Sequence, residues 1–318
     1  MQTLVDEVMK TSEIEGEILN AAEVRSSLAS HLGIPHGGVP VVDRRVDGVV
    51  AMMLDATTGF AAPLTDERLF GWHAGLFPTG WSGHSRLSVG QWRPSGSGPM
   101  RVVSAGRFGR EIIHFEAPAA ERLPEEMAAF LDWFNGPSPD DPVIRAGIAH
   151  LWFVTIHPFD DGNGRIARAV AEMALARADQ SAQRFYSMSS QIMHDRNSYY
   201  SILESTQQGS LDVTEWLEWF LRCLMAALER AEGQLASVKR KALWWSRAGD
   251  LGINARQREI VNRLLDGFNG NFTTAKWARI AKCSPDTALR DINGLVELGV
   301  LARSPAGGRS TKYDLAAG

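Results

Sequence analysis

The chain has 318 residues, of which 44% are hydrophobic, and its formal net charge is −4. This length allows two domains with a substantial core, and the charge excludes a strongly basic or acidic protein. Its two cysteines, Cys223 and Cys283, are too few for a disulfide framework or a cysteine metal cluster. No stretch reaches the roughly 18 apolar residues of a membrane span, and the N-terminus lacks the apolar centre of a secretory signal. We therefore expect a cytoplasmic protein.

The first predicted element is a helix from about residue 4 to residue 15, with apolar side chains along one side. Ser12 and Glu15 fit a capping box, and Gly16 fits a helix stop. On local grounds alone, this segment indicates only how a helix ends.

Helical patterns recur along most of the chain that follows. A pair of short β segments interrupts them at residues 100–103 and 111–115, and the glycines between these segments predict a hairpin. Residues 81–98 have no clear period and stay unassigned. The expected helices cover residues 20–31, 49–58, 64–76, 124–135, 143–156, 165–177 and 213–241.

Residues 157–168, HPFDDGNGRIAR, join two of these helices and carry several reactive groups. Gly162 and Gly164 allow a tight turn and close approach to a ligand. The free N–H groups at the start of the second helix, with the positive end of its dipole, form an anion site. Arg165 and Arg168 lie three residues apart and share a helix face behind it, so a phosphate chain fits across the turn.

Two further groups in this stretch extend the chemistry. Asp161 can hold a hard cation against phosphates, and His157 is placed to take a proton from an attacking hydroxyl. The stretch therefore predicts nucleotidyl or phosphoryl transfer. An EF-hand loop is the first alternative, but with Gly164 as its sixth residue the first ligand would be Phe159 and the twelfth Val170. An ordinary surface loop would explain any one of these residues, but not all of them at this spacing.

The stretch resembles the signature of Fic-domain proteins: His, any residue, Phe, any residue, Asp or Glu, Gly-Asn-Gly-Arg, two residues, Arg. Every fixed position from His157 to Arg168 is matched. The resemblance implies a mainly α fold, a Fic-type helical bundle with a small β-hairpin flap. It also implies a protein adenylyltransferase that uses ATP and Mg²⁺. Such an enzyme moves AMP to a Ser, Thr or Tyr hydroxyl of a target protein, or of itself, and releases pyrophosphate.

The resemblance assigns roles to individual residues. His157, Asn163 and Arg165 are the expected catalytic residues, and Asp161 is the expected Mg²⁺ ligand. Arg165 would orient the β-phosphate and Arg168 the γ-phosphate. The flap would cover the nucleotide and pair with a backbone segment of the target. The expected nucleotide-binding residues are Ile112, Ile113, His114, Phe115, Asp161, Gly162, Asn163, Gly164, Arg165, Arg168, Tyr199 and Gln207, with Tyr199 and Gln207 beside the adenine and ribose.

Thr11, Glu15 and Gly16 resemble the inhibitory motif of the same family: Ser or Thr, three residues, Glu, then Gly or Asn. A bidentate pair between Glu15 and Arg168 would deny that arginine to the γ-phosphate. We therefore expect self-inhibition, within one chain or between the chains of a homodimer. In the Fic subgroup that this N-terminal segment resembles, more sequence usually precedes the inhibitory helix. We therefore expect a trimmed or short variant.

The C-terminal part carries ten Lys or Arg and six Asp or Glu from Asn254 onward, a net charge of +4. Its expected helices, at 256–265, 274–281 and 285–298, precede short strands near residues 300 and 313, and this order resembles a winged helix-turn-helix. The residues expected to touch DNA phosphates are Arg290, Arg303, Arg309 and Lys312. Winged helices also serve as protein-contact modules. The expected domains are 1–62, N-terminal helices with the inhibitory motif; 63–242, the Fic catalytic domain, core 99–230; 243–253, a linker; and 254–318, the winged helix.

The same residues leave other functions open. One is removal of AMP from a modified protein, with Glu15 orienting a water molecule. Another is a DNA-binding regulator whose Fic domain is only a sensor. Fic relatives can also use another donor and move phosphate or phosphocholine, although two arginines suit a terminal triphosphate best. The sequence does not name the target protein.

Overall fold

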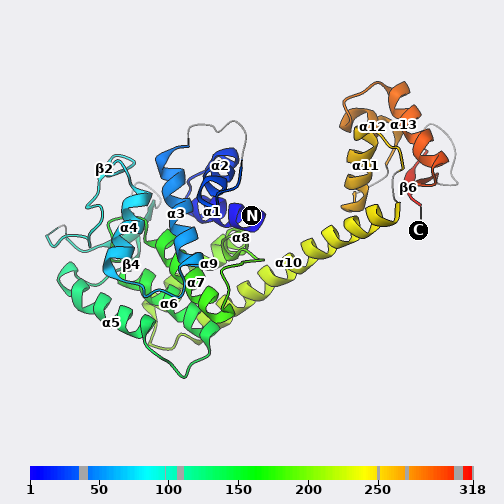
Figure 1. Cartoon of the computed structure of the whole chain (residues 1–318). Helices are drawn as coiled ribbons and strands as arrows, with labels where there is room; N and C mark the ends of the chain where they lie inside the picture. The colour runs from blue at the N-terminus through cyan, green and yellow to red at the C-terminus, as the bar shows by residue number, and fades with distance from the viewer. Residues whose placement is uncertain are drawn as a thin grey trace. The chain divides into compact units, whose positions relative to one another are not determined.

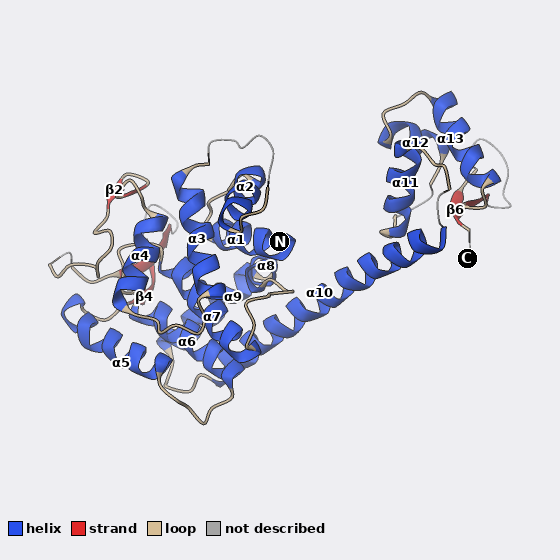
Figure 2. Ribbon diagram, in the orientation of Figure 1, coloured by secondary structure: helices blue, strands red, loops and turns tan. Residues whose placement is uncertain are grey.

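A computed structural model of the chain describes residues 1–35, 42–96, 98–105, 111–248, 251–268, 272–303 and 311–316. The protein is mainly helical, as predicted, with small antiparallel strand pairs (Figures 1 and 2). It divides into two compact units, Met1–Glu229 and Arg230–Gly318. No helix among the described residues combines the length and the hydropathy that a bilayer span requires.

Four helices open the first unit: α1 (Gln2–Ile14), α2 (Ala21–His31), α3 (Arg44–Thr58) and α4 (Asp66–Leu76). Asn20 caps α2, and its side chain accepts the Ala22 N–H at 2.9 Å. The predicted capping box at Ser12 is wrong. Ser12 is buried inside α1, and its hydroxyl has no hydrogen-bond partner among the described residues. The helix ends at Ile14, and Gly16, two residues further on, has a φ of +86°.

Two hairpins follow these helices. The region left unassigned from sequence contains a short one, β1 (Trp81–Ser82) with β2 (Ser85–Arg86). The second is the predicted flap, β3 (Arg101–Ala105) with β4 (Glu111–Glu116), which pair antiparallel with an irregularity between Val102 and Val103. The turn that joins β3 to β4 lies outside the described residues.

The centre of the first unit is α7 (Asn163–Asp179), which lies among the other helices in Figure 1. Its side chains are buried nearly all round, because α1, α3, α4 and α6 (Pro142–Ile156) all contact it. Helices α5 (Leu123–Asn135), α8 (Met188–His194) and α9 (Arg196–Gln208) complete the bundle. A helix enclosed in this way holds the residues at its two ends in fixed positions.

A long helix, α10 (Thr214–Ala248), follows α9 and extends beyond the predicted end at residue 241. Its buried residues form one apolar stripe, and the Trp216 indole N–H also donates to the Gly147 carbonyl at 2.8 Å. The stripe consists of Trp216, Trp219, Phe220, Cys223, Leu224 and Ala227.

The second unit contains α11 (Ala255–Leu265), α12 (Thr274–Ile280) and α13 (Pro285–Glu297), followed by the antiparallel strands β5 (Leu301–Arg303) and β6 (Tyr313–Leu315). Its core includes the fully buried Trp277, Ile292 and Leu295. Trp244 and Trp245 pack against this core, and the Trp245 indole donates to Asn262 Oδ1 at 2.8 Å. These tryptophans therefore belong to a folded unit, although the sequence had assigned them to a linker. Arg309 lies outside the described residues.

Helices α3 and α4 cross at two glycines, and this crossing gives a stability prediction. A Cβ at Gly48 would lie 1.9 Å from the Gly75 carbonyl oxygen, so Gly48→Ala must push two backbones apart. We expect a loss of unfolding free energy on the order of 2 kcal/mol or more in urea denaturation. Gly71→Ala, in open space on α4, is the control and should stabilise by roughly 0.5–1 kcal/mol. Equal effects would contradict the close crossing.

Candidate functional site

A cavity of about 670 Å³ opens beside the N-terminal end of α7, and this volume suits a small-molecule ligand. Its wall is built from the end of α1, the flap hairpin, the 157–164 turn and α9. Seven of the predicted site residues line it: Glu15, His114, Phe115, His157, Gly164, Tyr199 and Gln207. Val102 and Val103 of the flap also line it, and the sequence interpretation had not included them. Ile112 and Ile113 are about half exposed and are not among the lining residues.

His157 ends α6 in the left-handed conformation, with a φ of 52°. Such a backbone is uncommon for a residue with a side chain and is often found at functional turns. The ring Nδ1 lies 3.1 Å from the Val154 carbonyl oxygen, so Nδ1 carries the proton and Nε2 is left as the acceptor. Burial lowers the pKa of His157 below its usual value, which favours this neutral form.

Arg93 fixes the backbone of the turn from outside it. Its Nε donates to the His157 carbonyl at 2.9 Å, and its own N–H donates to the Pro158 carbonyl at 2.9 Å. Arg93 is 6% exposed, and it lies in the region that had no assignment from sequence. Because irregular segments carry no periodic signal, only the packed structure identifies this contact.

Asn163 closes the turn from inside. Its Oδ1 accepts the Phe159 N–H at 3.0 Å, and its Nδ2 donates to the Phe159 carbonyl at 2.8 Å. Phe159 is fully buried, and its ring stacks on His73 with 4.2 Å between centroids. Asn163 is one of the expected catalytic residues. In the structure both of its polar groups hold the turn.

Asp161 is engaged on both oxygens. Oδ2 accepts the Ser82 hydroxyl at 2.5 Å, and Oδ1 accepts the Gly162 N–H at 2.6 Å. No group of three or more His, Cys, Asp or Glu suited to a metal ion occurs among the described residues. Mg²⁺ is often bound by one carboxylate together with substrate phosphates, so Asp161 fits as its single protein ligand once Ser82 is exchanged.

Arg168 is 2% exposed and is bound to the end of α1. Its Nε donates to Thr11 Oγ1 at 2.8 Å, and its Nη2 donates to the Thr11 carbonyl at 2.8 Å and to Glu15 Oε1 at 2.7 Å. The predicted pairing of Glu15 with Arg168 is present, but it is not bidentate: Glu15 accepts only from Nη2, Thr11 accepts from Nε and Nη2, and Nη1 has no hydrogen-bond partner among the described residues. Burial alone would lower the pKa of Arg168, whereas the Glu15 carboxylate raises it above the usual value.

Arg165 and Gly164 also face acids from the N-terminal segment. Arg165 Nη1 donates to Glu17 Oε2 at 2.8 Å, and its guanidinium lies 5.1 Å from the centroid of the Phe77 ring. A Cβ at Gly164 would lie 2.3 Å from Glu15 Oε1, so glycine is needed for this approach. The sequence interpretation had assigned no role to Glu17.

On the α9 side, Tyr199 is 1% exposed, and its hydroxyl lies 2.9 Å from His150 Nε2. Burial raises the pKa of the Tyr199 phenol, so this side chain stays neutral. Gln207 Nε2 donates to Thr155 Oγ1 at 3.2 Å. His114 Nδ1 lies 2.9 Å from Glu204 Oε2, which links the flap to α9 across the cavity.

The geometry thus defines a helical domain with a ligand cavity at a helix N-terminus. Two buried arginines at this helix end are hydrogen-bonded by side chains of the N-terminal segment. Comparison with known proteins identifies the domain. Residues 63–175 match the model of the Fic/DOC family, and residues 1–34 match a domain of unknown function, DUF4172. The chain therefore carries a Fic domain.

Two curated relatives and one solved structure are similar to parts or all of this chain. Protein adenylyltransferase Fic from Nematostella vectensis is 34% identical over 133 residues, 40% of this chain and 29% of that protein. A uridine 5′-monophosphate transferase from Xanthomonas campestris pv. campestris is 32% identical over 126 residues, 36% of this chain and 22% of that protein. The chain thus spans less than a third of either relative. A Fic family protein from Desulfovibrio desulfuricans has the same fold, with a TM-score of 0.55, 21% identity, and coverage of 100% of this chain and 87% of that one.

The role of Asn163 in closing the turn gives a prediction. Asn163→Ala leaves the buried Phe159 N–H and carbonyl without partners, so we expect a loss of about 2 kcal/mol or more in unfolding free energy. Asn197→Ala is the matched control, because Asn197 is exposed on α9 and should change stability by less than about 0.5 kcal/mol. Chemical denaturation of both variants measures the difference. Similar stabilities would show that Asn163 does not hold the turn.

Proposed function

We propose that this protein is a protein adenylyltransferase that moves AMP from ATP to a Ser, Thr or Tyr hydroxyl of a target protein. The observation that carries the proposal is the cavity in which His157 Nε2, the N-terminal end of α7 and the flap meet. The Fic domain and the adenylyltransferase name of the Nematostella vectensis relative support it.

In the proposed reaction, the target hydroxyl gives its proton to His157 Nε2 while its oxygen attacks the α-phosphorus of ATP. The bond from the α-phosphorus to the bridging oxygen breaks, and pyrophosphate leaves. Backbone N–H groups around Gly162–Gly164 would stabilise the developing negative charge. Arg165 would orient the β-phosphate and Arg168 the γ-phosphate, while Tyr199 and Gln207 would border the adenine and ribose.

Asp161 would hold Mg²⁺, which supplies positive charge against the phosphates when it is bound. The Ser82 hydroxyl now bonded to Asp161 would give up its place on that carboxylate. Arg93 would act through the turn, because it holds the carbonyl of the residue that accepts the proton.

The proposed enzyme is inhibited by its own α1. Glu15 and Thr11 occupy Nε and Nη2 of Arg168, and Glu17 occupies Nη1 of Arg165, so these donors are not available to phosphates in this arrangement. An extra carboxylate also sits where a terminal phosphate would lie. These contacts lie within one chain.

We also propose a winged helix-turn-helix for the second unit. The order α11, α12, α13, then the β5–β6 pair supports it. Arg290 is exposed on α13, and Arg303 Nη2 donates to Asn293 Oδ1 at 2.6 Å, so both cations border one helix. Lys312 precedes β6. This arrangement favours contact with DNA phosphates as a second function, beside the catalytic one.

Labelling with α-³²P-ATP tests the enzyme and its inhibition. Glu15→Gly frees Arg168, so we expect labelling of a protein band to rise at least about tenfold, because phosphate misplacement costs large factors in rate. Glu13→Gly is the matched control, since Glu13 lies on the same helix end but pairs with Lys10. The double variant Glu15→Gly/His157→Ala should lose the signal.

The outcomes of this assay separate the rival functions. Running it with all four nucleoside triphosphates distinguishes AMP transfer from UMP transfer. Release of AMP from modified protein that requires an intact Glu15 would indicate the reverse activity. No labelling with any donor in Glu15→Gly would refute the transferase proposal.

The lowered pKa of His157 predicts a pH profile. The neutral imidazole accepts the proton, so activity requires a pH above the folded-state pKa, which lies below 6.5. We expect the labelling rate of Glu15→Gly to stay level from pH 8 to 6.5 and to fall only at lower pH. Circular dichroism at each pH is needed, because the buried His73, with its pKa lowered to about 4 by burial, also favours unfolding in acid. A midpoint above 6.5 would contradict the proposed base.

DNA contact by the second unit is tested by fluorescence polarisation with a random-sequence duplex. We expect binding that weakens steeply with salt, and Arg290→Ala should weaken it for every sequence and reduce the salt slope by about one. Leu289→Ala, at the neighbouring exposed position, is the control. Absence of binding at low salt would favour a protein-contact module.

A further inference from the structure

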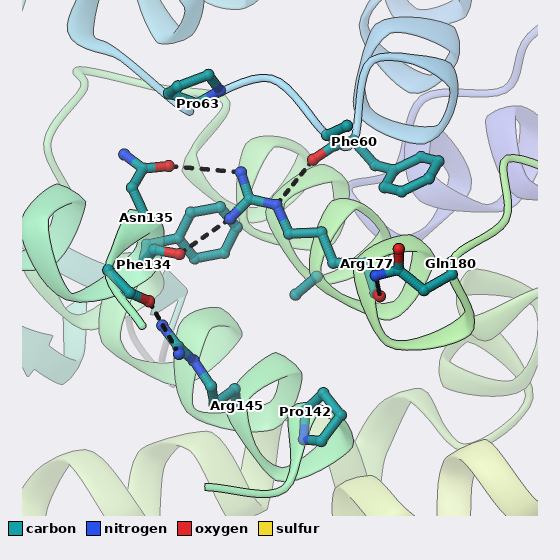
Figure 3. A pocket seen from close by; sticks show the side chains of 11 residues that line it. Phe60, Pro63, Phe134, Asn135, Pro142, Arg145, Arg177 and Gln180 are labelled. Atoms are coloured by element: carbon teal, nitrogen blue, oxygen red, sulfur yellow. Dashed lines mark hydrogen bonds between the residues drawn. The ribbon is translucent and has the colours of Figure 1, made fainter. Parts of the chain in front are cut away.

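A second cavity, of about 450 Å³, is built around the other end of α7. Its wall comes from residues 60–63, which join α3 to α4, and from the C-terminal end of α5, the first turn of α6 and the last turns of α7 (Figure 3). Because α7 has 17 residues, its two ends lie roughly 25 Å apart at a rise of 1.5 Å per residue. This cavity is therefore separate from the one that contains His157.

Two arginines line this cavity, and both donate to neutral acceptors. Arg177 donates to the carbonyls of Phe60, Phe134 and Ala62 at 2.8, 2.9 and 3.0 Å, and Figure 3 shows its guanidinium between the first two. Arg145 donates to the carbonyls of Gly136 at 3.2 Å and Trp133 at 2.5 Å. Within the described part of the chain, no Asp or Glu oxygen lies within the 4.0 Å ion-pair distance of either guanidinium.

These contacts explain how the arginines cap the end of α5, but they do not neutralise two full positive charges. A helix C-terminus offers about half an elementary charge. Burial, and then the charges of Arg68 and Arg145, lower the pKa of Arg177 to about 10. Arg68 has its own partner, Asp55 at 2.6 Å. The cavity therefore carries an excess of positive charge that a bound anion would offset.

The remaining donors and walls define what would fit. A guanidinium has five N–H groups, and Arg145 makes two hydrogen bonds to described residues, which leaves donors for a carboxylate or phosphate. The other walls are largely apolar and come from Phe60, Pro63, Phe134 and Pro142. A cavity of this volume, mostly apolar with a few convergent charged groups, has the composition of a ligand site.

We propose that this cavity binds a small organic anion. Its carboxylate or phosphate lies against Arg145 and Arg177, where it accepts hydrogen bonds and offsets their charge. Its apolar body packs on Phe60, Pro63 and Phe134. The site is independent of nucleotide binding at the other end of α7.

Isothermal titration calorimetry of the full chain tests this site with phenyl phosphate, benzoate, inorganic phosphate and phenol as probes. Phenyl phosphate or benzoate should bind saturably at one site, and the stronger of the two identifies the anionic group. Phenol, which lacks the charge, should bind at least about tenfold more weakly, and so should the anion to Arg145→Gln. Inorganic phosphate, which lacks the apolar body, should also bind more weakly than phenyl phosphate. Arg122→Gln is the matched control, because Arg122 is exposed and pairs with Glu126.

Two further variants test the anion site even if Arg145→Gln does not fold. Ala61→Trp fills the cavity from its exposed edge without removing a donor, and should abolish binding at an unchanged melting temperature. Arg165→Gln removes a cation at the opposite end of α7 and should leave the affinity unchanged. The proposal is overturned by an absence of saturable binding of either organic anion. It is equally overturned by binding that survives Ala61→Trp, or by binding that Arg165→Gln abolishes. Because the nucleotide site is not involved, these outcomes do not depend on adenylyl transfer.

Discussion

The buried guanidinium of Arg168 is the constraint on which the first unit depends. A charge with 2% exposure is stable only when polar groups surround it, and here Thr11 and Glu15 of the α1 segment provide them. One set of contacts therefore satisfies a buried cation, docks the N-terminal helix and occupies a candidate phosphate site. Under the proposed function, the contacts that stabilise the buried Arg168 are also the contacts that inhibit the enzyme. A nucleotide that binds Arg168 must replace every contact that it displaces.

The enclosed position of α7 explains why the residues at its N-terminal end have fixed positions. Helices α1, α3, α4 and α6 all contact it, so its N-terminal end and its arginines are held by packing on several sides. The turn that leads into it is held from within by Asn163 and from outside by Arg93. Functional sites place their binding groups on rigid elements, and switches add an element that can adopt two states. The flap hairpin and the end of α1 also border the cavity, but they do not belong to the turn or to α7.

The sequence predicted much of this because the critical residues follow one another along the chain. The motif from His157 to Arg168 is a single turn and helix start, and helix periods located most of the bundle. The pairing of Glu15 with Arg168 came from resemblance, since nothing local links residues so far apart. Contacts made by Arg93 and Ser82 were not predictable, because both lie in an irregular segment. The contacts of Asn163 were not predictable for a different reason: an amide at a turn can face a ligand or its own backbone, and only packing decides between them.

The absence of a side chain at Gly164 affects how the proposed inhibition by Glu15 can be relieved. The Glu15 carboxylate approaches the backbone at this position so closely that any β-carbon would collide with it. Being tethered on the same chain, that carboxylate competes with a diffusing ligand at an effective concentration in the millimolar range. Under the proposed function, ambient nucleotide alone is therefore a poor trigger. Activation would come most readily from an event that withdraws the N-terminal helix, such as capture of that helix by another molecule.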